Sequence, residues 1–166
     1  MMQILESHLP SYDRATALVE VYVQHISFFF RPVKREQIVG ELIPKFYKRH
    51  GRDEKRAAKD DAEITEHQLA LLFAVFACGA AGDLTLDSCN EEGETYRQLA
   101  RSALSLHSVF EGTSFATVQA VATIGAYDFH SASSQTIESA FKILSLALGL
   151  GITVQSPLPF ISSIDR

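Results

Sequence analysis

The chain has 166 residues, 46% of them hydrophobic and 21% charged, with a formal net charge of -5 at pH 7. These proportions are typical of a folded globular domain and exclude a chain that is disordered throughout. Two cysteines, Cys78 and Cys89, are too few for a disulfide-stapled secreted scaffold. We therefore expect a reduced, intracellular setting.

The longest apolar stretch without a charge covers residues 69–82, which is 14 residues. A membrane-spanning helix needs about 20 such residues, so this stretch predicts a buried helix and no membrane association. The first residues lack the basic group and the following apolar run of a secretory signal.

The first predicted helix begins at the Pro10-Ser11 step, and apolar residues recur along it at the spacing of one helical face. The residues of this face are Ala15, Leu18, Val19, Tyr22, Ile26 and Phe29. Pro32 disfavours helical dihedrals in the residue before it, so we expect the helix to end near Phe30. A shorter helix is predicted over residues 34–43, ending at Pro44 because proline cannot donate a helical hydrogen bond.

Positive charge is concentrated in one segment. Residues 45–59 contain 7 basic and 2 acidic residues, whereas residues 60–166 contain 4 basic and 13 acidic residues. Since its charges are mixed, the segment 45–63 is interpreted as a solvated basic linker within one helical domain. A nuclear import signal and a phosphate-contacting patch are the alternatives. The acidic remainder argues against contact between this chain and duplex DNA, because like charges repel.

The central prediction is a core helix that follows Thr65. Thr65 and Gln68 have the spacing of a capping box, in which each side chain binds the backbone N–H of the other residue. The following residues, 69–82, are apolar or small on every face, so other helices must surround them. Gly79 is expected to let one of these neighbours approach closely.

Two further helices are predicted next. Ser88 and Glu91 have the spacing of a second capping box, which opens a surface helix. The apolar stripe of that helix is Tyr96, Leu99, Ala100, Ala103 and Leu106. Ser114 opens the next helix. Its inward residues are expected to be Phe115, Val118, Ala122, Ala126 and Phe129.

The last helix is expected over residues 135–148, with Gly149 and Gly151 ending it in a left-handed cap. Its inward residues are expected to be Ile137, Ala140, Phe141, Leu144 and Leu148. The prolines after residue 155 predict an extended tail. No strand pattern competes, so the predicted class is all-α, an irregular bundle of about six helices over residues 1–166.

Residues that could do chemistry are scattered. The histidines, at positions 8, 25, 50, 67, 107 and 130, show no spacing that places two metal ligands on one helical face. Cys78 lies in the apolar helix, where a thiol packs as a small hydrophobe, and Cys89 is expected to be an ordinary exposed thiol. Nucleophile-elbow, phosphate-loop and dinucleotide motifs are absent from the sequence. We predict no catalytic, cofactor-binding or metal site; an enzyme assembled from scattered helices is the alternative.

Five groups of residues, taken in order, occupy most of residues 9–152. They are Leu9-Pro10 with Leu18-Val19-Glu20-x-Tyr22, His25 and Phe28-Phe29-Phe30-Arg31-Pro32; residues 69–77 with Gly79-Ala80; Tyr96-Arg97-Gln98-Leu99-Ala100-Arg101; Thr117-Val118-Gln119-Ala120; and Ala140-Phe141 with residues 144–151. In this order the chain resembles the fungal-specific transcription factor regulatory domain. That domain is the middle homology region of binuclear zinc cluster transcription factors, also called the xylanolytic transcriptional activator regulatory domain.

The resemblance implies a non-catalytic domain that regulates transcription in the nucleus through protein partners, self-association or a small-molecule effector. The family contacts DNA through a zinc cluster with six cysteine ligands, which two cysteines cannot supply. Zinc and DNA contact are therefore expected only in a cluster outside this chain. The alternative is a free-standing helical scaffold, unrelated to transcription, that binds an amphipathic helix of a partner.

The sequence also departs from the family pattern. Gly151 stands where many members have a histidine, and the arginine-rich segment with tryptophan that usually follows is missing. The chain is thus similar to the N-terminal part of the family's domain, and we expect it to be part of a larger helical domain. The helices at residues 69–82 and 135–148 would then lack some of their cover, which predicts an exposed apolar patch that favours self-association.

Overall fold

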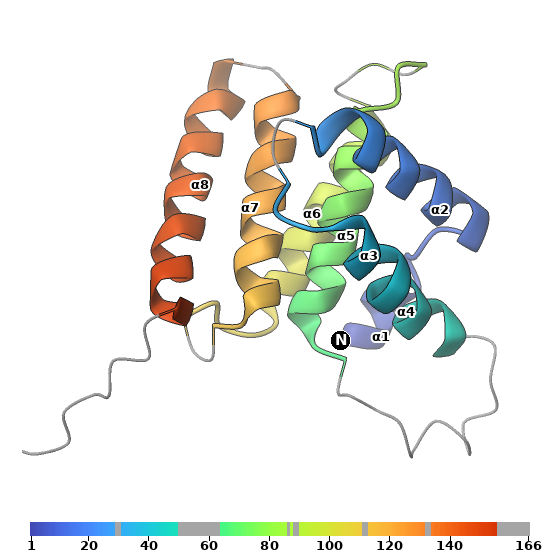
Figure 1. The fold of residues 1–166 in the computed structure, drawn as a ribbon, viewed down its shortest axis with the longest axis horizontal. Coiled ribbons are helices and arrows are strands. Elements are labelled where there is room, and N and C mark those ends of the chain that lie inside the picture. The colour runs from blue at the N-terminus through green and yellow to red at the C-terminus, as the bar shows by residue number, and fades with distance from the viewer. Residues whose placement is uncertain are drawn as a thin grey trace, which may run out of the picture.

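The computed structural model describes residues 1–28, 31–49, 64–85, 87, 90–110, 113–131 and 134–155. All regular structure in these ranges is helical, which confirms the all-α class (Figure 1). Two elements, η1 and η2, are single π-helical turns. In chain order the elements are α1 (Met2–Glu6), α2 (Tyr12–Val21), η1 (Tyr22–Ile26), α3 (Arg35–Gln37), η2 (Ile38–Leu42), α4 (Ile43–Arg49), α5 (Glu66–Ala81), α6 (Glu91–Ser105), α7 (Phe115–His130) and α8 (Ser134–Gln155).

Helix α5 is the centre of the fold, as predicted. Residues 69–80 are all buried, since α2, η1, α6 and α7 pack around them. The capping box is confirmed, because the Gln68 N–H donates to Thr65 Oγ1 at 3.3 Å and the Thr65 N–H donates to Gln68 Oε1 at 3.4 Å. The expectation that this helix would expose an apolar patch was wrong, because its neighbours cover every face.

Gly79 is the point of closest approach between α2 and α5. A Cβ atom at this position would lie 2.2 Å from the carbonyl oxygen of Leu18. Only glycine therefore allows α2 to lie on α5 at this distance, which confirms the role predicted for Gly79.

The first long helix changes its winding before it ends. The predicted face is buried at Ala15, Leu18, Val19, Tyr22 and Ile26. The α-helix itself stops at Val21, and the π turn η1 continues to Ile26, where the Ser27 N–H donates to the carbonyl of Tyr22 at 2.9 Å. The expected end near residue 30 lies outside the described residues, as does Phe29.

The prediction that a helix ends at Pro44 was wrong. The π turn η2 runs directly into α4, and the Ile43 N–H bonds the carbonyl of Ile38, five residues back. Pro44 is then the second residue of α4, directly after the wider turn of η2, and the helix continues past it although the proline nitrogen donates no hydrogen bond to the preceding turn. Residues 45–49 consequently belong to a helix, and Phe46 is buried in the core, so the basic linker does not begin at residue 45. Residues 50–63 lie outside the described part of the chain.

Helix α6 has the predicted stripe but a different start. Asn90 caps it, because its Oδ1 accepts the N–H of Gly93 at 2.7 Å. The predicted capping box at Ser88 is wrong since the helix begins two residues later than that box requires; Ser88 and Cys89 themselves are outside the described residues. In the stripe, Tyr96, Ala100 and Ala103 are buried and Leu99 and Leu106 are half-buried.

Helix α7 is more deeply buried than predicted. It lies between α5 and α8 (Figure 1), and residues 119–128 are all buried. Ala120, Ile124 and Tyr127 join the core around α5, whereas Val121 and Ala122 pack with residues of α8. Phe115 and Phe129, expected to point inward, are exposed. The small residues at the middle of α7 are buried between its neighbours, whereas the two large rings near its ends are exposed.

Helix α8 passes through both glycines that were expected to end it. It continues to Gln155, and neither Gly149 nor Gly151 has a positive φ. The local signal for a left-handed cap is overridden because Leu150, which lies between the glycines, is buried against α7.

Candidate protein-interaction surface

The side of α8 that faces away from α7 carries an apolar stripe. Phe141, Leu148 and Ile152 are 64%, 70% and 61% exposed. With Ser145 they occur at positions i, i+4, i+7 and i+11, which follow one line along a helix. We call these four residues the outer stripe.

The sequence placed Phe141 and Leu148 inward, and this was wrong. The inward residues of α8 include Ala140, Ala147 and Leu150. Two alanines are favoured there because α7 comes very close to α8: a Cβ atom at Gly125 would lie 2.9 Å from the side chain of Leu144. Larger side chains at positions 140 and 147 would hold the two helices apart.

The charges beside the outer stripe cancel. Lys142 Nζ lies 2.8 Å from Glu138 Oε1, one helical turn away, and both side chains are largely exposed. An exposed pair of this kind contributes little to stability. Its effect is to leave the outer face of α8 with no net charge, which suits an apolar partner.

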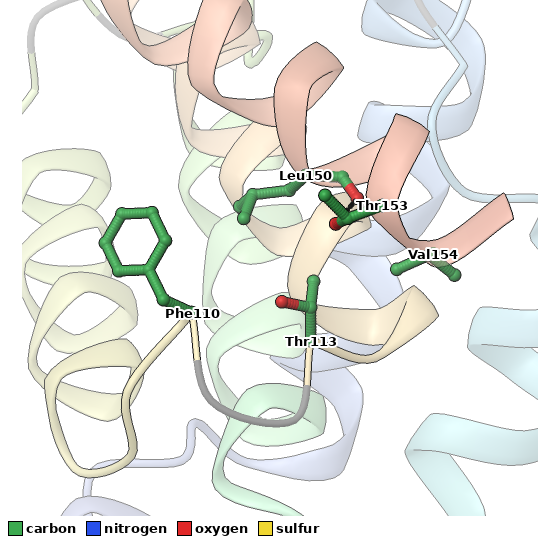
Figure 2. A pocket seen from close by; sticks show the side chains of 5 residues that line it. All are labelled: Phe110, Thr113, Leu150, Thr153 and Val154. Carbon is green, nitrogen blue, oxygen red and sulfur yellow. Dashed lines mark hydrogen bonds between the residues drawn. The ribbon is translucent and has the colours of Figure 1, made fainter. Parts of the chain in front are cut away.

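A pocket of about 280 Å³ lies between the last turns of α8 and the segment that joins α6 to α7 (Figure 2). It is lined by Phe110, Thr113, Leu150, Thr153 and Val154. Both threonine hydroxyls donate to backbone carbonyls, Thr113 to Val109 at 2.8 Å and Thr153 to Leu150 at 2.6 Å. The described residues that line the pocket therefore offer apolar surface and hydroxyl acceptors, and none of them is ionisable.

His67 is buried and fully engaged in hydrogen bonds. Its Nδ1 lies 2.6 Å from Thr117 Oγ1, and its Nε2 lies 3.3 Å from the carbonyl oxygen of His107. Since a carbonyl only accepts, Nε2 donates to His107, and in a neutral imidazole ring this leaves Nδ1 to accept from the threonine hydroxyl. The histidine thus ties the start of α5 to the start of α7, which is a structural role.

A buried ion pair escaped the sequence analysis. Asp128 is 1% exposed; its Oδ2 accepts from Ser139 Oγ at 3.2 Å, and its Oδ1 lies 3.5 Å from Arg97 Nη1. Burial raises the pKa of Asp128, an effect that the Arg97 charge opposes. The one available signal was an aspartate among the apolar residues of α7, but its partner on α6 is 31 positions away. The Arg97–Asp128 pair joins α6 to α7, and the bond from Ser139 joins α8 to both.

An acidic hollow of about 420 Å³ lies beside the first turns of α6. Its lining residues are His8, Glu91, Glu92, Thr95, Tyr96 and Leu99. Arg14 holds Glu92 by a two-point contact, with Nε donating to Oε1 at 3.0 Å. Burial raises the pKa of Tyr96 to about 12, so its hydroxyl keeps its proton at neutral pH. His8 is also paired, since its Nδ1 lies 2.8 Å from the carbonyl oxygen of Ile4, so most of the polar groups that line the hollow already have partners.

Cys78 packs as the sequence predicted. Its thiol is buried, lies 3.4 Å from the carbonyl oxygen of Thr123, and has its pKa raised by burial. Cys89 lies outside the described residues. Three or more histidine, cysteine or carboxylate side chains placed to hold a metal ion do not occur together in the described ranges.

No family model, curated protein or solved structure gives a significant match to this chain. Among the described helices, none has both the length and the apolar character that crossing a membrane requires.

Proposed function

We propose that the chain is a non-catalytic regulatory domain of a fungal transcription regulator and that it acts through protein contacts made by α8. The observation that carries this proposal is the outer stripe, an uncharged apolar surface on a helix with one main neighbour. DNA contact would be made by a zinc cluster outside this chain, so the domain itself needs neither zinc nor a basic surface.

The placement of the quoted sequence segments supports the proposal. The first segment covers α2 and η1, and the other four fall on α5, α6, α7 and α8 respectively. The segments therefore fall on successive structural elements, in the order of the resemblance. Their small and apolar residues supply the contacts between helices, as Gly79 does between α5 and α2.

The pocket in Figure 2 gives a small-molecule effector a place to bind. Its volume is at the low end for ligand sites, so it suits a small apolar group rather than a drug-sized molecule. Because Thr153 and Val154 belong to the end of α8, an occupant would contact the helix that carries the outer stripe.

A reporter assay tests the proposal. The chain is placed between a heterologous DNA-binding domain and an activation domain, and reporter output is compared with that of a fusion that lacks the chain. We expect the wild-type chain to change the output and Leu148→Glu, which puts a charge in the outer stripe, to abolish the change. Leu84→Glu is the matched control, because Leu84 is 84% exposed in the turn after α5. Equal output from wild type, Leu148→Glu and the fusion without the chain contradicts the proposal.

The free-standing scaffold is supported by the same stripe, since an amphipathic helix of a partner could pack on it. The location of the chain in the cell distinguishes the transcription regulator from the scaffold. A fluorescent fusion too large to diffuse through nuclear pores is expected to enter the nucleus if the chain is a transcription regulator. Exclusion from the nucleus would favour the scaffold.

A further inference from the structure

The spacing of the outer stripe is that of a coiled-coil seam. Phe141, Ser145, Leu148 and Ile152 are separated by four, three and four residues, which are the alternating steps of a heptad pattern. Ala140, Ala147 and Leu150, which face α7, belong to the opposite side of the helix. Helix α8 is therefore built with two packing faces, of which one is occupied.

We propose that the outer stripe pairs with the outer stripe of a second copy of this chain, antiparallel and about a two-fold axis. The proposal rests on the function proposed above for the role of α8, and it names one partner for that surface. The axis would pass between residues 146 and 147. A two-fold contact requires a surface that complements itself, and the outer stripe meets this requirement.

In this arrangement, the side chains that face each other across the two outer stripes are complementary in size. Phe141 of one copy lies opposite Ile152 of the other, and Ser145 lies opposite Leu148. Small Ser145 leaves room for the leucine, so the helices can approach each other without a gap at the centre. The antiparallel direction also places the positive end of each helix dipole beside the negative end of the other.

Charge favours a second copy at this face. Each chain carries a net charge of -5, so two copies repel over most of their surfaces. The outer stripe has no charged member, and Glu138 and Lys142 beside it neutralise each other. In the antiparallel pair, these two residues lie opposite uncharged residues at positions 155 and 151 of the other copy.

The area is sufficient for a weak dimer. From their exposed fractions, the outer-stripe residues present roughly 400 Å² of surface per copy, most of it apolar. Two copies would bury about 800 Å², the size of a weak, transient contact. We therefore expect a dissociation constant of about 100 µM.

Sedimentation equilibrium tests the pairing. Between about 1 and 200 µM, the wild-type mass should rise from 18.3 kDa towards twice that value. Leu148→Glu should stay monomeric throughout, and Leu84→Glu should behave as wild type, with circular dichroism showing that both variants are folded. A monomeric wild type, or a Leu148→Glu variant that dimerises equally well, overturns the proposal. This result is independent of reporter output, so the proposed function can stand or fail separately.

Distance measurement tests the direction. A nitroxide label is attached to Glu138→Cys in a Cys89→Ser background, where Cys78 is buried. In the antiparallel pair, the two labelled backbones are about 25 Å apart along the helix axis, because 17 residues at about 1.5 Å each separate positions 138 and 155. A parallel pair would bring them within about 10 Å, the usual distance between packed helices. The short distance would overturn the antiparallel arrangement.

Discussion

Replacement of Gly79 by alanine adds one methyl group where α2 lies on α5. The new Cβ would stand 2.2 Å from the carbonyl oxygen and 2.8 Å from the carbonyl carbon of Leu18, whereas ordinary contacts begin at 3.4 Å. Both atoms belong to the backbone, so no side-chain rotation relieves the overlap. Helix α2 has to move by about 1 Å, and a close-packed core resists such a movement.

Two opposing effects set the change in the free energy of unfolding for Gly79→Ala. Alanine is favoured over glycine in a helix by about 1 kcal/mol. Overpacking costs about 1–3 kcal/mol, and an overlap with backbone belongs at the upper end. We expect Gly79→Ala to lower the free energy of unfolding by about 1–2 kcal/mol.

Urea unfolding followed by circular dichroism, at a concentration where the chain is monomeric, measures this change. Gly40→Ala is the matched control, because nothing lies within 4 Å of a Cβ atom at that position. It should raise the free energy of unfolding by about 0.4–1 kcal/mol. If Gly79→Ala also stabilises the protein, then α2 does not lie on α5 as described and the reasoning is refuted.

Three further predictions concern buried groups. Burial raises the pKa of Asp128, so the folded state binds this proton more tightly than the unfolded chain does. The proton therefore contributes to the free energy of unfolding at low pH, and this contribution is lost as the pH rises through the pKa of the folded state. As the pH rises from about 3 to about 7, the free energy of unfolding of Asp128→Asn should therefore increase relative to that of wild type. Urea titrations measure this difference, and a difference that does not change with pH contradicts the prediction. Gln119 and Gln37 exchange two hydrogen bonds of 2.9 Å. Gln119→Leu removes both of these bonds and the one that Gln119 Nε2 donates to the carbonyl of Pro32. Because Gln37 is half-buried, the cost should be about 1 kcal/mol, and unchanged stability would show that the pair is not formed. In a Cys89→Ser background, a thiol reagent should modify Cys78 only as the protein unfolds, and rapid labelling in native buffer would contradict its burial.

The core helix and its cap could be predicted because local signals and tertiary packing agree there. Thr65 and Gln68 form the cap from adjacent residues, and an apolar helix such as α5 has to be surrounded. No comparable sequence pattern indicated the π turns η1 and η2. At Pro44 the local rule predicts an end, but the wider turn of η2 lets the helix continue, and periodicity alone does not show this.

The sequence predicted an exposed apolar patch on the last helix, and α8 has one, but Phe141 and Leu148, which form it, were placed on the buried side. Residues 135–148 are apolar on several sides, so the pattern shows that α8 has buried surface without showing which side is buried. Which side of α8 faces α7 is decided by the close approach of the two helices at Gly125. This approach favours alanines on the buried side of α8, so Phe141 and Leu148 lie on the exposed side. Likewise, Asp128 and Arg97 meet only because α6 and α7 are neighbours, and one sequence does not reveal such pairs.

The main contacts of α8 are with α7, whereas α5 packs against several elements at once. Separating α8 would uncover Val121 and Ala122 but would leave the shell of helices around α5 in place. Amide hydrogens of α8 should therefore exchange through a local opening that costs less free energy than global unfolding. Any partner that holds α8 closed would slow this exchange, and the protection would extend to α7 before it reached α5.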